Sequence, residues 1–186
     1  MDEPTSAPAR PLRDSLVLLA QVALMLRPPQ DLPPSRWLMR LATLAYLLVG
    51  TWLLSDRLGP ATAFLMASAD ALLLAGFTAF ILALQGRLAR LRQTWTALAG
   101  AGALISAVML PLLALIGSLL HAGDGGLSTF LVYLLFAWLL AVNAHIFRHA
   151  FELSNIFFGL AAAVVQYLFS EVMLALLFAS QLETLT

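Results

Sequence analysis

The 186-residue chain contains no cysteine and no lysine, and all ten of its basic residues are arginines. Without cysteine there can be no disulfide, no thiolate nucleophile and no metal or iron–sulfur centre held by thiolates. Ten acidic residues balance the arginines, so the chain has no overall positive charge that would attract nucleic acid. We therefore expect neither a thiol-dependent centre nor a nucleic-acid partner.

Charged residues of either sign are also scarce. They make up 11% of the chain, against about 25% in soluble domains, while 61% of the residues are hydrophobic. A soluble fold of this length could not bury so much apolar surface. The composition predicts an all-α integral membrane protein.

Apolar runs and the breaks between them predict a bundle of five transmembrane helices. Ser35 is a candidate N-cap for the first, and Pro60 a helix-starting residue for the second. The transmembrane domain occupies residues 36–186, and its expected helices lie at about 37–54, 60–85, 95–120, 127–144 and 152–179.

A segment of residues 1–35 precedes the bundle and is expected to lie in the cytoplasm. It contains a helix at about 12–26, too short to cross roughly 30 Å of hydrocarbon. Asp14 and Gln21 share one face of this helix, with Leu18, Leu19, Val22 and Met25 around the other side. The pattern predicts an amphipathic helix in the membrane interface, and packing against the bundle is the alternative.

Arginine positions predict the orientation, because arginine and lysine collect on cytoplasmic loops. With the amino terminus inside, only Arg57 falls outside. The inner segments then contain Arg10, Arg13, Arg27, Arg36, Arg40, Arg87, Arg90, Arg92 and Arg148. The prediction is a multi-pass protein of the bacterial inner membrane with a cytoplasmic amino terminus and a periplasmic carboxyl terminus.

Two carboxylic acids interrupt the predicted transmembrane helices. Asp70 and Glu171 each lie about ten residues from the expected outer face, roughly 15 Å deep, and a carboxylate there costs at least ~2.5 kcal/mol. Tyr133 and Gln166 are polar candidates for the same region. One hypothesis is a proton- or cation-binding pair in a transport path; the other is that the protonated acids hydrogen-bond between helices.

The segment HIFRHAFE places His145, His149 and Glu152 at i, i+4 and i+7. On one helix these side chains would share a face, with a spacing compatible with zinc or iron ligation. The alternative is that the histidines contact water or headgroups while Arg148 pairs with Glu152. No fourth ligand and no HExxH motif is visible, so no cofactor is predicted.

The segment RLARLR contributes Arg87, Arg90 and Arg92 to one inner loop. It has no interleaved aromatic residues, which single-stranded nucleic acid would favour. It is interpreted as an orientation signal that contacts anionic lipid headgroups, with docking of a protein partner as the alternative. The chain also lacks a recognisable catalytic triad, phosphate-binding glycine loop or Rossmann fingerprint, so an enzyme is not expected.

An amino-terminal segment ending in LRPPQDLP, five transmembrane helices, and ALAGAGALISAVMLPLLALIG in the third resemble the Yip-domain family of membrane proteins. The resemblance implies a non-enzymatic protein that acts in membrane organisation or through protein partners. The leading functional hypothesis is thus a non-catalytic protein that binds or assembles membrane partners or its own copies among membrane lipids. A small transporter or channel component using Asp70 and Glu171 is second, and an intramembrane metalloenzyme is third.

Overall fold

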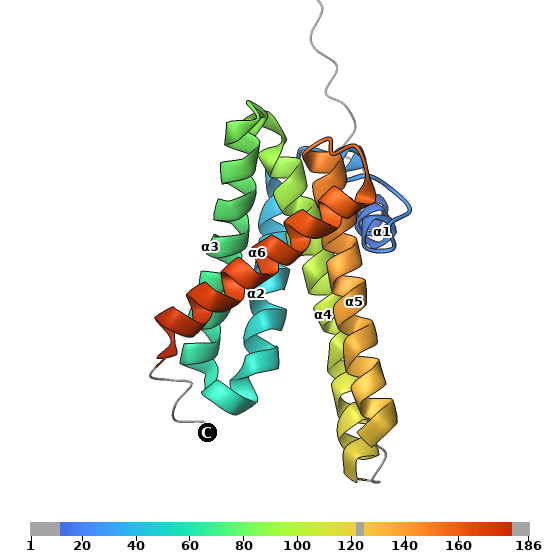
Figure 1. Cartoon of the computed structure of the whole chain (residues 1–186), viewed down its shortest axis with the longest axis vertical. Coiled ribbons are helices and arrows are strands. Elements are labelled where there is room, and N and C mark those ends of the chain that lie inside the picture. The colour runs from blue at the N-terminus through green and yellow to red at the C-terminus, as the bar shows by residue number, and fades with distance from the viewer. Residues whose placement is uncertain (1–11, 122–124, 180–186) are drawn as a thin grey trace, which may run out of the picture.

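The computed structural model describes residues 12–121 and 125–179, and the regular secondary structure of these residues is entirely helical (Figure 1). The predictions for Arg10, for residues 122–124 between the third and fourth expected helices and for the terminus at 180–186 lie outside this part. The α-helices are α1 Leu12–Ala23, α2 Arg36–Leu58, α3 Pro60–Leu84, α4 Leu91–His121, α5 Gly125–Ala150 and α6 Ile156–Leu177. Two short 3₁₀ turns, η1 Pro29–Asp31 and η2 Leu88–Arg90, lie in the connections.

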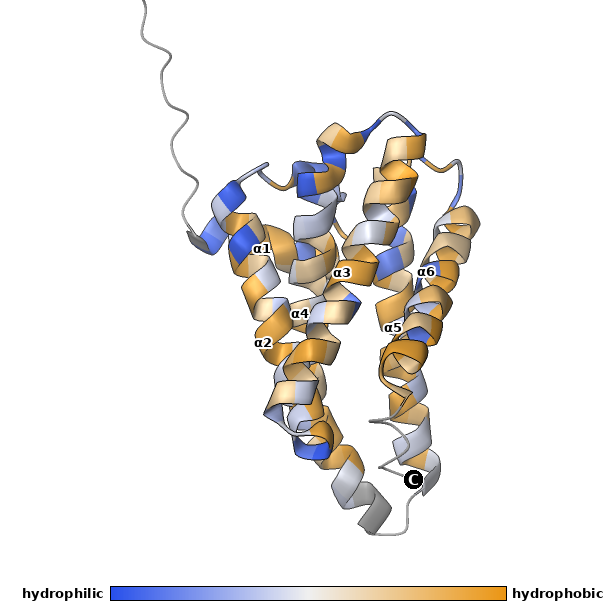
Figure 2. Cartoon of the chain, turned by 90° about the vertical axis from the view of Figure 1, so that its left-hand side faces the viewer, coloured by the Kyte–Doolittle hydropathy of each residue, from blue (hydrophilic) through white to orange (hydrophobic). Residues whose placement is uncertain are grey.

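Among the described residues, five helices are long and apolar enough to cross a membrane: α2, α3, α4, α5 and α6. Their length and composition confirm the prediction of five such helices and indicate a multi-pass membrane protein. Hydrophilic residues gather at the end of the bundle where α1 lies, and hydrophobic residues cover most of the helix lengths (Figure 2).

Local sequence signals explain where three of these helices begin. The Ser35 hydroxyl accepts a hydrogen bond from the amide of Leu38, so Ser35 caps α2 as predicted. Gly59, at φ +75°, turns the chain between α2 and α3 and allows Pro60 to occupy the first turn of α3. The Asn155 side chain caps α6 by accepting from the amide of Phe158.

The connection between α5 and α6 is shorter than expected and lies later in the chain, at residues 151–155 instead of 145–151. Instead of ending near 144, α5 continues to Ala150, because nothing between Asn143 and Ala150 breaks a helix. It ends in a Schellman motif, in which the amide of Leu153 donates to the Arg148 carbonyl and Glu152 has φ +51°. The cap at Asn155 then starts α6 at Ile156 rather than near 152.

Helix α4 lies at the centre of the bundle and contacts α1, α2, α3 and α5. Every residue from Thr94 to Gly102 is buried, and most of them are small, so neighbouring helices approach its backbone closely. Helix α6 crosses the bundle obliquely, against α5 and α3 (Figure 1). The bundle is therefore two helix hairpins, α2–α3 and α4–α5, joined through α4 and bridged by α6.

Helix α1 packs across α4 with Leu19, Val22 and Ala23 buried. A Cβ added at Gly100 would lie 2.6 Å from a methyl of Leu19, so at this crossing the leucine side chain fills the space that glycine leaves. The opposite face exposes Leu16 and Val17 together with Arg13 and Asp14. The structure thus shows a helix packed on the bundle, and its contact with the membrane interface stays a prediction. Helix α1 is also shorter than the expected helix at about 12–26. It ends at Ala23, and Met25 beyond it has a left-handed backbone with φ +59°.

The crossing of α5 and α6 depends on Gly159, because an added Cβ would overlap the backbone carbonyl of Ala144. We expect Gly159→Ala to lower the free energy of unfolding by about 1–3 kcal/mol, since backbone cannot move aside cheaply. Thermal unfolding of the detergent-solubilised protein measures the loss. The matched control is Gly76→Ala, where the new methyl meets no atom within 4 Å. An equal effect of both substitutions would contradict this packing.

Candidate functional site

A cavity of about 330 Å³ lies inside the bundle, and all five long helices contribute to its wall. Its polar lining residues are Tyr46, Asp70, Ser106, Asn143, Gln166, Tyr167 and Glu171. Its apolar lining residues are Gly50, Leu53, Leu54, Met66, Ala67, Leu74, Leu98, Gly102, Leu139 and Leu174. The volume falls within the roughly 300–1,000 Å³ typical of ligand sites.

Asp70 is half-buried in the wall of this cavity, on α3. The hydroxyl of Tyr46, on α2, donates a hydrogen bond to its Oδ2 atom. The Tyr46 ring is wedged against the backbone of Gly102, where an added Cβ would lie 2.7 Å from the ring, and it meets the Trp95 ring edge to face. Tyr46 therefore occupies a defined position, and its hydroxyl orients the Asp70 carboxyl.

Glu171 borders the same cavity from α6, but its residue is exposed where Asp70 is half-buried. The two carboxyl groups are close enough to interact electrostatically. On the next turn of α6, Gln166 is buried and donates from its amide to the hydroxyl of Ser170, 3.0 Å away. The cavity thus has a half-buried acid from α3, an exposed acid from α6, and the buried amide of Gln166 on the same helix as Glu171.

None of the described residues that line the cavity is basic. Two carboxyl groups that share an apolar site without a cationic partner do not both remain ionised. They become neutral by binding a proton, or they bind a cation. This arrangement can therefore hold a positive charge between the helices.

The structure brings together three of the four residues predicted for this region, Asp70, Glu171 and Gln166. It does not bring Tyr133 to them, because that residue is 68% exposed on α5 and does not line the cavity. Tyr46 and Asn143 line the cavity and were not predicted. The sequence offered one signal for both residues, a polar side chain within an apolar helix. Tyr46 is the more important of the two because its hydroxyl hydrogen-bonds to the Asp70 carboxyl.

The histidines of the predicted metal set lie in the last turns of α5, with ring centroids 4.6 Å apart. The Nε2 atom of His145 is 3.0 Å from the carbonyl oxygen of Arg27, which can only accept, so this nitrogen donates. Glu152 does not share their helix face, because α5 ends at Ala150 and the backbone of Glu152 is left-handed. Within the part of the chain that the structure describes, no three His, Asp or Glu side chains are placed to hold a metal ion.

Glu152 pairs with arginines of the RLARLR segment instead of with Arg148. Its two carboxylate oxygens lie 2.6 Å from Arg87 and 2.5 Å from Arg90. Arg87 also donates to the carbonyl of Phe151, 3.1 Å away. The two arginines therefore tie the α3–α4 connection to the α5–α6 connection, and of the three RLARLR arginines only Arg92 lacks this acidic partner.

Comparison of the chain with known protein families, with curated proteins and with solved structures gives no match.

The pair of arginines makes stability depend on pH. The hydrogen bond from Arg90, together with the charges of Arg87 and Arg90, holds the pKa of Glu152 below its usual value. The resulting stabilisation is present above the unfolded-state pKa of about 4.3 and is lost as the pH falls through the lower folded-state pKa. The wild type should therefore lose stability as the pH falls below about 4.3, and Glu152→Gln should lose less over the same range because it lacks the titrating carboxylate. Melting temperatures of both proteins from pH 7 downward test this, and parallel curves would contradict it.

Proposed function

We propose that the protein binds a proton or a small cation inside the membrane and acts as a small transporter or channel component. One observation carries the proposal: Asp70 and Glu171, on helices far apart in the sequence, line one cavity whose described lining has no basic side chain. Ionisable groups in transmembrane helices are costly, and they commonly mark ion or substrate pathways.

The difference in exposure between the two acids supports a path rather than a single site. A cation from outside the bundle would meet Glu171 first and then Asp70, which is the more buried of the two. The Tyr46 hydroxyl donates a hydrogen bond to Asp70 and so holds that carboxyl group in place for the charge it would bind. Tyr46 is a positioning residue in this mechanism.

The end of the bundle that holds Arg36, Arg87, Arg90 and Arg92 is called the arginine-rich end. The cavity extends away from it, toward the turn between α2 and α3. Leu53 and Leu54 line it and lie four to five residues from the end of α2 at Leu58. On the other side it is bounded by Leu98, beyond which Trp95 and Ala97 are buried. In the proposed mechanism, access in this conformation would be from the end with the α2–α3 turn, and transport would require a second conformation open to the other end.

The hypothesis of a scaffold for membrane partners depends on layout alone. The apolar side chains exposed along the five long helices are what contact with lipid requires, so they do not favour a protein partner. The Yip-domain resemblance and the placement in a bacterial inner membrane likewise remain predictions.

We infer that the arginine-rich end faces the cytoplasm, following the rule that basic residues stay inside. The absence of cysteine makes this testable without background labelling. In intact cells, a membrane-impermeant maleimide is expected to label Asp56→Cys, at the α2–α3 turn, and not Arg36→Cys, at the start of α2. Both positions are exposed, so reactivity is matched once the cells are opened. The reverse labelling pattern would invert the orientation.

For the proposed function, we expect Asp70→Asn and Glu171→Gln to abolish proton or monovalent-cation flux while leaving the helices inserted. Neither amide can take up and release a proton, although both preserve shape. The measurement is flux into reconstituted vesicles under an imposed gradient, followed with a pH-sensitive dye and, in parallel, with sodium and potassium indicators.

The matched control is Asp56→Asn, which removes an exposed acid at the end of α2 and should leave flux unchanged. A hydrophobic carbodiimide provides a second readout, because it modifies protonated carboxyl groups in apolar surroundings, and mass spectrometry should locate the adduct at Asp70. Flux that is absent in the wild type, or equal in wild type and Asp70→Asn, would refute the transport function.

A further inference from the structure

A second hollow lies at the arginine-rich end, between the start of α4 and the helices α2 and α3. Its volume is about 400 Å³. The lining residues are Met39, Ala75, Leu88, Ala89, Leu91, Arg92 and Trp95. Arg92 is their only charged member, and the Trp95 ring nitrogen is already committed to the Thr43 hydroxyl at 2.8 Å. The groove is thus apolar along its length and positively charged at one point.

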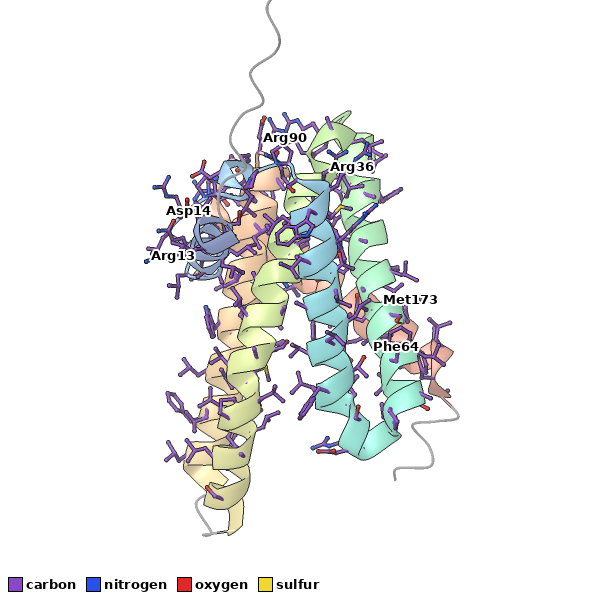
Figure 3. All side chains as sticks on the ribbon, turned by 180° about the vertical axis from the view of Figure 1, so that it is seen from behind. Arg13, Asp14, Arg36, Phe64, Arg90 and Met173 are labelled. Carbon is purple, nitrogen blue, oxygen red and sulfur yellow. The ribbon has the colours of Figure 1, made fainter. Side chains whose placement is uncertain are left out.

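Part of the arginine charge near this groove has no ion-pair partner among the described residues. Arg87 and Arg90 are paired with Glu152, whereas Arg92, Arg36 and Arg40 form no ion pair with any described residue. Arg92 donates to the carbonyl of Pro34, 3.3 Å away, and so lies beside the start of α2 where Arg36 is exposed. Figure 3 shows Arg36 and Arg90 at the same end of the bundle, away from Phe64 and Met173.

We propose that this groove binds an anionic phospholipid, with the headgroup phosphate at Arg92 and one acyl chain between Met39, Leu91 and Trp95. A guanidinium has five N–H donors in a fork that suits phosphate oxygens, and the carbonyl of Pro34 uses one. The apolar floor then takes the hydrocarbon chain. This site is separate from the acidic cavity and does not depend on the proposed transport.

The shape and position of the groove favour a lipid over other anions. A soluble phosphate compound would gain nothing from six uncharged lining residues, of which Leu88 is 52% exposed and so open to an apolar ligand. The groove begins at Leu91, the first residue of α4, where a bundle end meets the headgroup region. From there it runs inward to Ala75, nine residues from the end of α3, a depth of about 14 Å at 1.5 Å per residue.

The test is a lipid titration of the full chain in detergent, followed by native mass spectrometry. Phosphatidylglycerol is expected to remain bound at lower concentration than phosphatidylcholine of the same chain length. Arg92→Gln should weaken phosphatidylglycerol binding roughly tenfold, the loss expected for a charge-assisted contact, and should leave phosphatidylcholine little changed. Ala89→Trp, at an exposed lining position, should weaken both lipids by filling the groove.

Arg57→Gln is the matched control, since it removes an exposed arginine from the other end of the bundle. It should bind phosphatidylglycerol as the wild type does. Equal losses in Arg92→Gln and Arg57→Gln would show general charge attraction and overturn the site. Displacement of the lipid by millimolar glycerol 3-phosphate would overturn the requirement for an acyl chain, as would unchanged lipid binding in Ala89→Trp.

Discussion

The close packing of neighbouring helices around residues 94–102 of α4 is the constraint on which the rest of the structure depends. In a membrane, helices gain little from hiding apolar surface and associate where small side chains let their backbones approach. Gly100 admits Leu19 of α1, and Gly102 admits the ring of Tyr46. Two glycines on one helix thus leave room for the docking of α1 and for the ring of the residue that orients Asp70.

The two sites described above lie on opposite sides of a single row of side chains. Trp95 forms part of the apolar groove and meets Tyr46 edge to face, and Tyr46 in turn donates to Asp70 in the acidic cavity. Thr43 fixes the Trp95 ring from α2 by accepting from its nitrogen. The groove and the cavity therefore share a wall of two aromatic rings, although one site is basic and the other acidic.

The five long helices could be predicted because runs of apolar residues need no knowledge of tertiary contacts. Asp70 and Glu171 were predictable for the same reason, since a carboxyl group inside such a run is costly wherever it points. Tyr133 shows what the sequence could not predict. The position of a residue along a helix gives its depth, but only the packing of the helices decides which residues face the cavity. The end of α5 could not be predicted either, because the left-handed residue that follows the helix is Glu152 and not the glycine or asparagine that usually marks such an end.

The α4–α5 hairpin extends farther from the arginine-rich end than the α2–α3 hairpin (Figure 1). With 31 residues, α4 is about 46 Å long, whereas α2 has 23 residues and is about 35 Å long. Against a hydrocarbon core of roughly 30 Å, the longer hairpin must tilt or leave its tip in the headgroups. The two hairpins consequently differ in hydrophobic length, so that bilayers of different thickness would favour different tilts of the longer one.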